Sequence, residues 1–342
     1  MKNFIKINLR KIKYIILAVF TIFLIGCGAS KEESSAKKLD TVDVVLDWYP
    51  NAIHCFLYNA IEKGYFEEEG IKVNIHFPSN ASDPMALPAA KKADIGIYYL
   101  HHLVMARANE NIPIKSIGAI TQKPLNVIIS LKENNITRAK DLEGKVVGYS
   151  GGPLTEESLK AMVEYDGGDP AKVKVMDVGF ELLTSMITRQ VDATNGGLIN
   201  HEVPVMIEKG FEVNYFYCTE FGMPNYYEEI FVANDDLIKE RKDVYVRFLR
   251  AANKGFKDMM NDPEGSLDIL LAKQEADQFP LSRNVETQSI NILLPIMKEE
   301  GVPFLHQEIS VWEENIDWLY EHKIINKKVD AKEMFENLYE EK

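Results

Sequence analysis

Apolar and polar residues alternate along several short stretches of this chain, and residues 71–77 show the pattern most clearly. Apolar side chains occupy every second position there, with polar side chains between them. A period of two predicts a strand with one buried face. Short apolar runs predict further strands over 42–46, 94–98, 116–121 and 126–131. Helical patterns separate these runs, so the sequence predicts an α/β fold with largely parallel sheets.

The stretch 46–64 predicts a strand end, a polar turn and a helix. Asn51 is suited to the N-cap, because its side-chain oxygen can accept a hydrogen bond from a free amide of the first turn. One apolar helix face then follows, formed by Ile53, Phe56, Leu57, Ala60 and Ile61. Gly64 is a suitable residue to end the helix. Trp48, Asn51 and His54 therefore surround one helix N-terminus, which predicts the mouth of a ligand site.

Residues 134–145 are polar and rich in turn-forming side chains, which predicts that the chain crosses there into a second lobe. Strand and helix patterns alternate again over 145–198, residues 229–234 predict the return, and mainly helical patterns follow. The expected organisation is a lipoprotein signal peptide at 1–27, a flexible tether at 28–38, lobe one at 39–132 and 232–342, and lobe two at 133–231.

The N-terminus has the pattern of a secretory signal. Five Lys or Arg residues precede an apolar run of 13 residues at 14–26. That run is too short for a membrane-spanning helix, which needs about 20 residues. Leu24-Ile25-Gly26-Cys27 resembles a bacterial lipobox, which predicts that Cys27 is lipidated and holds an extracytoplasmic protein at the cell membrane. The alternative is an uncleaved anchor in which Cys27 is incidental.

The charge and the cysteines exclude several classes of function. The net charge is −13 and becomes −18 without the five cations of the signal, which argues against nucleic acid as a partner. The three cysteines form no CxxC pattern, so neither a metal site nor a cofactor is expected. Cys55 and Cys218 could form one disulfide, but their spacing does not require it.

A set of motifs around the predicted ligand mouth resembles the opening signature of the thiamine pyrimidine-precursor family. These motifs are Asp47-Trp48, Pro50-Asn51, His54, Gly64-Tyr65-Phe66 and Glu69-Gly70. The family includes ThiY-like binding proteins of ABC importers and related fungal pyrimidine synthases. The resemblance implies a two-lobed type II periplasmic (solute) binding protein, in which each lobe is a mainly parallel sheet flanked by helices and two crossovers join the lobes.

Candidate ligand residues come from the pattern and from the resemblance. Trp48 offers a flat face for a ring, and Tyr99 follows a strand at its carboxyl end, where open α/β sheets bind ligands. Asn51 is expected to be a cap and also a ligand contact, while His54 is either structural or a ligand contact. The resemblance adds Asn200, Glu202, Tyr226 and Glu228. It leaves the register open between Tyr226 and Tyr227 and between Glu228 and Glu229.

Together with the lipobox-like sequence, the resemblance implies a lipid-anchored, monomeric receptor that delivers a thiamine pyrimidine precursor to the permease subunits of an ABC importer. Aromatic faces can stack on an aminopyrimidine, and carboxylates can accept hydrogen bonds from its amine. The same fold could instead bind riboflavin, another flat heterocycle, a sulfonate or nitrate. An enzyme similar to the fungal synthases is the alternative from another class. Those enzymes carry a cysteine cluster for iron, which this sequence lacks.

Overall fold

The computed structural model describes residues 39–150, 154–274 and 280–339 of the 342-residue chain. The predicted signal peptide, lipobox and tether lie outside the described residues. Within these three ranges, no helix combines the length and the apolar character that crossing a membrane requires.

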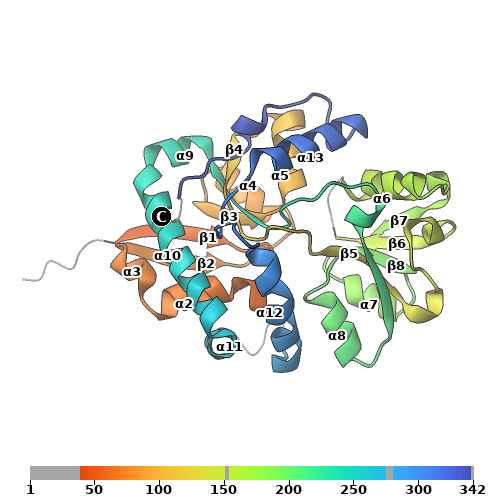
Figure 1. Ribbon diagram of the computed structural model, residues 1–342, viewed down its shortest axis with the longest axis horizontal. Helices are drawn as coiled ribbons and strands as arrows, with labels where there is room; N and C mark the ends of the chain where they lie inside the picture. Colours follow the sequence, from red (N-terminus) through yellow and green to blue (C-terminus); the bar gives the residue numbers. More distant parts are fainter. Residues whose placement is uncertain (1–38, 151–153, 275–279, 340–342) are drawn as a thin grey trace, which may run out of the picture. The chain divides into compact units, whose positions relative to one another are not determined.

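Five strands form the sheet of lobe one, in the order β2-β1-β3-β10-β4 (Figure 1). Their bounds are Asp40–Val45 for β1, Ile71–His76 for β2, Ile95–Tyr98 for β3, Ile114–Ala119 for β4 and Ile230–Asn234 for β10. Strand β1 is parallel to β2 and β3, whereas β10 is antiparallel to β3 and β4. Four strands therefore share one direction, and β10, which comes late in the sequence, runs against them.

The sheet of lobe two repeats this arrangement in the order β7-β6-β8-β5-β9. Its strands are Asn126–Leu131 for β5, Val146–Tyr149 for β6, Lys174–Asp177 for β7, Ala193–Leu198 for β8 and Val213–Tyr217 for β9. Strand β6 is parallel to β7 and β8, while β5 is antiparallel to β8 and β9. The predicted α/β fold with two mainly parallel sheets is confirmed.

The chain passes between the two sheets twice, first between β4 and β5 and again before β10. The sequence predicts residues 126–131 to belong to lobe one, and that prediction is wrong, because β5 pairs with β8 and β9 in lobe two. The turn-rich residues 134–145 are an excursion within lobe two rather than the crossing. A short apolar run predicts a strand but does not say which sheet it joins.

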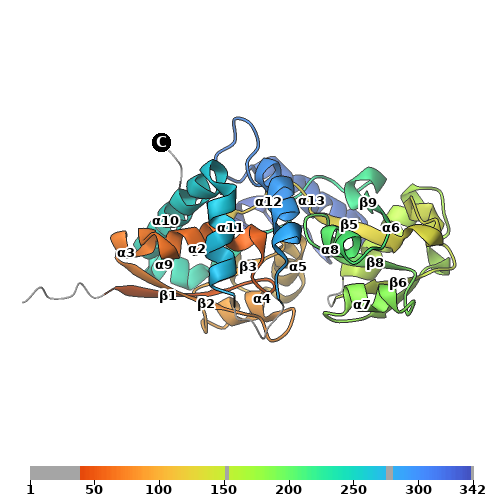
Figure 2. The same cartoon turned by 90° about the horizontal axis from the view of Figure 1, so that it is seen from below.

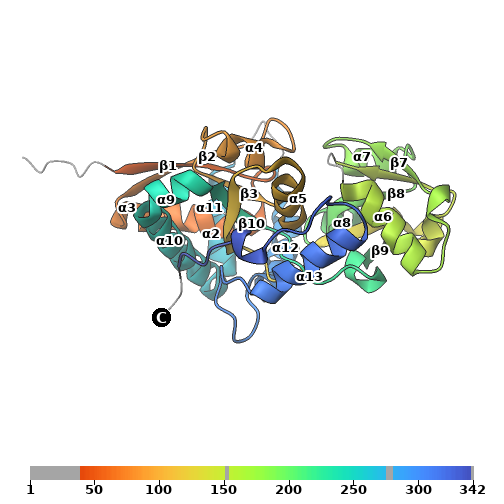
Figure 3. The ribbon, with the colours of Figure 1, turned by 90° about the horizontal axis from the view of Figure 1, so that it is seen from above.

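Helices cover both sheets and fill the border between the lobes. In lobe one they are α2 (Cys55–Glu62), α3 (Tyr65–Glu68), α4 (Asp83–Ala89), α5 (Leu100–Glu110), α9 (Asp235–Glu240), α10 (Lys242–Asn261), α11 (Pro263–Ala272), α12 (Arg283–Met297) and α13 (Ile309–Glu321). In lobe two they are α6 (Leu154–Tyr165), α7 (Leu182–Ile187) and α8 (Glu202–Glu208). Figures 2 and 3 show α12 at the border, where it contacts α8.

The helix predicted after Asn51 begins with one 3-10 turn, η1 (Ala52–His54), and continues as α2. Asn51 caps it as predicted, because its Oδ1 accepts a hydrogen bond from the Ile53 amide at 3.1 Å. Gly64 adopts a φ of 75° just beyond the end of α2, a conformation that favours glycine. The apolar face packs against α10 so closely that a Cβ on Gly255 would lie 2.0 Å from the Phe56 carbonyl oxygen. This packing fixes the position of the η1 turn.

Candidate functional site

A cavity of about 470 Å³ lies between the lobes, and both lobes contribute to its wall. Lobe one supplies the β1–η1 turn, residues 80–85 and the start of α5, and lobe two supplies the ends of β5 and β8 and the start of α8. Six of the eight predicted ligand residues line it, namely Trp48, Asn51, Tyr99, Glu202, Tyr226 and Glu228. The other two, His54 and Asn200, are buried outside the wall.

His54 is fully buried and supports the cavity wall from behind. Its Nδ1 accepts a hydrogen bond from the Asn51 amide at 3.2 Å. Its Nε2 therefore carries the proton and donates to Asp47 Oδ1 at 3.0 Å. The Tyr99 hydroxyl donates to the other Asp47 oxygen at 3.2 Å. Of the two roles open in the sequence, the structure gives His54 the structural one: it completes the helix cap and orients Asp47.

Glu229 is fully buried beside this pair. Burial raises the pKa of its carboxyl well above the usual value, and the charges of Asp47 and Glu228 raise it further. Ligand atoms of Asp47, His54 and Glu229 lie within 4.8 Å of one another, a spacing that a metal ion could use. The His54 tautomer, however, leaves its Nε2 without a lone pair for a metal. We therefore interpret the trio as a proton-bearing network beneath the cavity.

Glu228 is buried too, but it lines the cavity. Its Oε2 accepts hydrogen bonds from the amides of Leu125 and Asn126 at 2.9 and 2.8 Å. Burial raises the pKa of this carboxyl, and the two amides and Tyr226 oppose the rise. Leu125 and Asn126 lie at the first crossing between the lobes and Glu228 lies just before β10, so this carboxylate ties the two crossings together. Of the two glutamates that the sequence left open, Glu228 reaches the cavity and Glu229 does not.

Aromatic rings line the cavity. Trp48 lies edge-on to Phe180 of lobe two, with ring centroids 4.5 Å apart. Tyr226 lines the cavity, whereas Tyr227 does not. The Tyr226 ring lies 4.4 Å from the ring of His101. Phe180 carries no local signal in the sequence, because its contact with Trp48 depends on how the two lobes meet.

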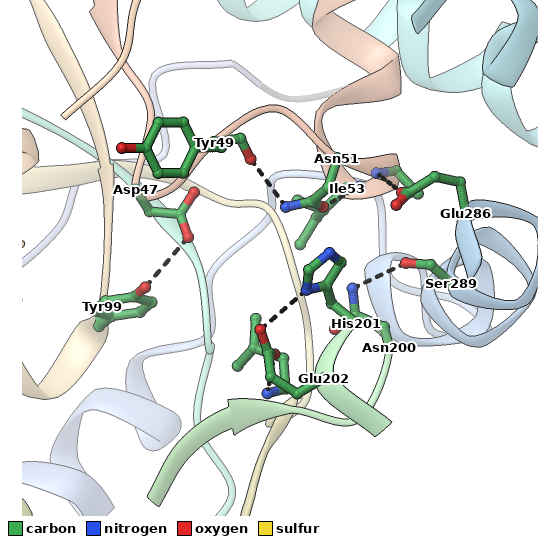
Figure 4. A network of polar contacts seen from close by, with 12 residues as sticks. Asp47, Tyr49, Asn51, Ile53, Tyr99, Asn200, His201, Glu202, Glu286 and Ser289 are labelled. Atoms are coloured by element: carbon green, nitrogen blue, oxygen red, sulfur yellow. Dashed lines mark hydrogen bonds and ion pairs between the residues drawn. The ribbon is translucent and has the colours of Figure 1, made fainter. Parts of the chain in front are cut away.

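Three consecutive polar residues, Asn200, His201 and Glu202, follow β8 and lead into α8 (Figure 4). Glu202 accepts hydrogen bonds from the Leu198 amide at 2.7 Å and lies 3.0 Å from His201 Nδ1. Asn200 donates to the Ser289 hydroxyl of α12 at 3.1 Å. Asn200 is therefore a contact between lobes, whereas Glu202 reaches the cavity.

Three histidines that were not among the predicted ligand residues also line the cavity. Burial lowers the pKa of His201, but Glu202 and Glu286 outweigh this effect and raise it to about 9, so its imidazole is charged at neutral pH. Burial lowers the pKa of His101 and His102 to about 4, so both are neutral. His101 and His102 follow β3 and Tyr99 directly, at the start of α5. Because open α/β sheets bind ligands at the carboxyl ends of their strands, this position could have identified the pair from the sequence.

Acidic side chains outnumber positive charges in the described cavity wall, where the imidazolium of His201 faces three carboxyl groups. Asp47, Glu202 and Glu228 contribute carboxylates, and no Lys or Arg belongs to the part of the wall that the structure describes. Cys218 also lines the cavity, and burial raises the pKa of its thiol to about 12. Cys55 and Cys218 are both free and buried, so the disulfide that the sequence left open is not formed.

Comparison with known proteins finds relatives that are similar to nearly the whole chain. A family model described as NMT1/THI5 like matches residues 51–266. The formylaminopyrimidine-binding protein of Halalkalibacterium halodurans is 39% identical over 96% of this chain and 99% of its own length. The 4-amino-5-hydroxymethyl-2-methylpyrimidine phosphate synthase of Uromyces fabae is 27% identical over 74% of this chain and 77% of its own.

Solved structures share the fold at much lower sequence identity. The alkanesulfonate-binding protein SsuA from Xanthomonas axonopodis pv. citri, bound to MOPS, has a TM-score of 0.67 and 12% identity over 87% of this chain and 99% of that one. The predicted two-lobed binding-protein fold is thereby confirmed. Fold and relatives together support a substrate-binding role rather than an enzymatic one. Because the family model matches more than half of the chain, this protein belongs to the NMT1/THI5-like family.

Proposed function

We propose that this chain is the extracytoplasmic binding protein of an ABC importer and captures a thiamine pyrimidine precursor of the formylaminopyrimidine or hydroxymethylpyrimidine type. The observation that carries the proposal is a cavity in which aromatic faces stand beside carboxylates, with no Lys or Arg in the described wall. An aminopyrimidine is flat and carries amino donors, so it complements both features. The 39% identical relative is named for a ligand of this class.

Each part of the wall has a role in this proposal. Trp48 and Tyr226 both line the cavity and supply ring faces. Glu228 and Glu202 accept hydrogen bonds from amino groups, and a charged acceptor makes such a bond stronger. Asn126 also lines the cavity, and its side chain is held there by donating to Asn195 Oδ1 and accepting from the Gly196 amide. A ligand without amino groups would leave buried acceptor groups of the wall unpaired, and each unpaired group would cost about 1–3 kcal/mol of binding free energy.

The remaining parts of the proposal are the anchor and the partner. We propose that Cys27 is lipidated, that the mature chain stays at the outer face of the cell membrane as a monomer, and that it delivers its ligand to the permease subunits. The basis is the lipobox-like Leu24–Cys27 sequence and the binding-protein fold. The two crossings between the lobes would permit closure around the ligand.

Calorimetric titration of the mature protein with a panel of ligands tests the proposal. The panel contains formylaminopyrimidine, hydroxymethylpyrimidine, riboflavin, taurine and nitrate. We expect the tightest binding for one of the two pyrimidines. Micromolar binding of a sulfonate without binding of either pyrimidine would contradict the proposal. Tighter binding of riboflavin than of either pyrimidine would show that the ligand is a larger heterocycle. Mass spectrometry of small molecules that co-purify with the chain gives an independent answer.

The control for charge is Glu110→Gln, since Glu110 is exposed at the end of α5 and is not part of the cavity wall. This variant should bind the same ligand with the same affinity as the wild type. A loss of affinity in this variant would mean that general surface charge, rather than the cavity, decides the result.

A further inference from the structure

Strand β8 contains a bulge beside the cavity. Its pairing with β5 shifts register between Val127 and Ile129, and two residues of β8, Asn195 and Gly196, lie in this irregular part of the ladder. Gly196 has a φ of 105°, a conformation that favours glycine. Both residues line the cavity. Because an extra residue interrupts the alternation of side chains along a strand, a bulge can aim a side chain into a site that a regular strand would not serve.

The hydrogen bonds of Asn126 fix the orientation of the Asn195 side chain. The Gly196 amide donates to Asn126 Oδ1 at 3.0 Å, and a backbone N–H can only donate, so the nitrogen of the Asn126 side chain lies on the other branch. That nitrogen, Nδ2, donates to Asn195 Oδ1 at 3.0 Å. The oxygen of Asn195 is therefore used by Asn126, which leaves the Asn195 Nδ2 as the opposite branch of the side chain.

This Nδ2 is a donor that the described part of the protein does not use. The described cavity wall contains four asparagines, namely Asn51, Asn80, Asn126 and Asn195. The side-chain nitrogens of the first three donate to oxygen atoms of the protein at distances between 2.6 and 3.2 Å. The Asn195 Nδ2 has no acceptor among the described residues, and it does not belong to the unpaired atoms that are closed to solvent. Since Asn195 is only 5% exposed and lines the cavity, its N–H groups are available to a ligand there.

We propose that Asn195 is a specificity-determining residue: its Nδ2, aimed by the β8 bulge and by Asn126, donates a hydrogen bond to an acceptor atom of the ligand, which in an aminopyrimidine is a ring nitrogen. The inference rests on the proposed function and deepens it. An aminopyrimidine carries ring nitrogens that accept hydrogen bonds as well as amino groups that donate them. Ionised carboxylates of the wall can pair only with the amino groups. A ring nitrogen needs a donor, and Asn195 supplies one.

The first test is Asn195→Asp, which keeps an oxygen for Asn126 and replaces the donor with a second acceptor. Calorimetry at about pH 8, well above the ordinary aspartate pKa, favours the ionised carboxyl. The probes are the panel pyrimidine that binds the wild type and its two aminopyridine analogues, in each of which C–H replaces one ring nitrogen. The wild type should bind the analogue without the contacted nitrogen about tenfold more weakly than the pyrimidine. In Asn195→Asp this preference should disappear, and affinity for the pyrimidine should fall about tenfold or more.

Two further variants separate this role from a merely structural one. Asn195→Ala removes the donor without adding a charge, and it should also lose the preference for the pyrimidine over that analogue. Asn291→Asp makes the same change of charge on an exposed residue of α12 that is not part of the cavity wall, and it should keep both affinity and preference. A side chain that only supported β8 would weaken the pyrimidine and both analogues alike, so the preference would survive its loss.

The outcomes separate this inference from the proposed function. A full preference for the pyrimidine in Asn195→Asp or Asn195→Ala overturns the inference, and so does a wild type that binds both analogues as tightly as the pyrimidine. If no pyrimidine binds the wild type, the proposed function fails. The donor is then tested with the panel member that does bind, because riboflavin, taurine and nitrate all carry acceptor oxygens. Asn195→Asp should still weaken its binding about tenfold, and unchanged affinity would overturn the inference as well.

Discussion

Replacing Glu228 can separate two roles that the structure assigns to one carboxylate. Its Oε2 accepts two backbone hydrogen bonds, from Leu125 and Asn126, and the same side chain lines the cavity. The first role joins the crossings between the lobes. The second is the proposed acceptance of a hydrogen bond from the ligand amine. Glu228→Gln keeps an oxygen for the two amides but removes the charge, whereas Glu228→Ala removes both.

The expected magnitudes differ between the two variants. In Glu228→Gln the loss of a hydrogen bond to a charged group should weaken pyrimidine binding by about 1.5–3 kcal/mol. That range corresponds to about tenfold to a hundredfold in the dissociation constant. In Glu228→Ala two buried amides lose their acceptor, at about 1–3 kcal/mol each. Total domain stability is about 5–15 kcal/mol, so the alanine variant should be visibly destabilised.

Calorimetry and thermal unfolding together read out the two roles. Glu228→Gln should lose affinity but retain the thermal midpoint of the wild type. Burial raises the pKa of Glu228, which means that the site disfavours the charged side chain, so a neutral glutamine should not destabilise the fold. Glu228→Ala should lose both. The exposed Glu110→Gln should change neither. Wild-type affinity in Glu228→Gln would refute the ligand role, and an unchanged midpoint in Glu228→Ala would refute the link between crossings.

Four further predictions concern other parts of the chain. Because the folded-state pKa of Glu229 is raised, its contribution to stability is present at low pH and is lost as the pH rises from its ordinary value of 4.5 through the folded-state value. The unfolding temperature of Glu229→Gln should therefore fall less than that of the wild type as the pH is raised above 4.5, and parallel curves would contradict the raised pKa. Gly255→Ala places a Cβ 2.0 Å from the Phe56 carbonyl oxygen and should lower the free energy of unfolding in urea by at least about 1–3 kcal/mol; no loss would mean that α2 and α10 are less closely packed. Trp48→Ala should weaken pyrimidine binding by about 1–3 kcal/mol, by analogy with base stacking on aromatic side chains, while the exposed Tyr320→Ala binds normally. Cys27→Ala should release the chain from membranes or leave it unprocessed, and identical fractionation and mass would refute lipidation.

Local patterns predicted the features that depend on neighbouring residues. The Asn51 cap, the end of the helix near Gly64 and its apolar face all follow from spacing within a few turns, and the structure confirms them. The helices after β10 were predicted for the same reason, because a period of 3.6 is a property of the local sequence. Such patterns describe an element but not its partner.

Features that depend on distant partners were not predictable in this way. Residues 126–131 were correctly predicted as a strand, but their sheet is decided by pairing with β8 and β9. Asn200 was selected as a ligand residue, yet its side chain meets Ser289 on α12. Nothing near Asn200 in the sequence could reveal that contact. Phe180 was not predicted for the same reason, since its ring meets Trp48 across the border between the lobes.

The hydrogen bonds already made by the cavity carboxylates narrow the kind of ligand that fits. Asp47 is engaged by His54 and Tyr99, and both oxygens of Glu202 are held by His201 and the Leu198 amide. These groups need no cation from the ligand, because the protein itself supplies their donors. An anion would meet three carboxyl groups, and the described wall offers it only the His201 imidazolium, which already contacts Glu202, and no Lys or Arg. The remaining acceptor capacity suits a ligand that brings a few N–H groups on a flat, uncharged ring, which is the chemistry of an aminopyrimidine and not that of a sulfonate.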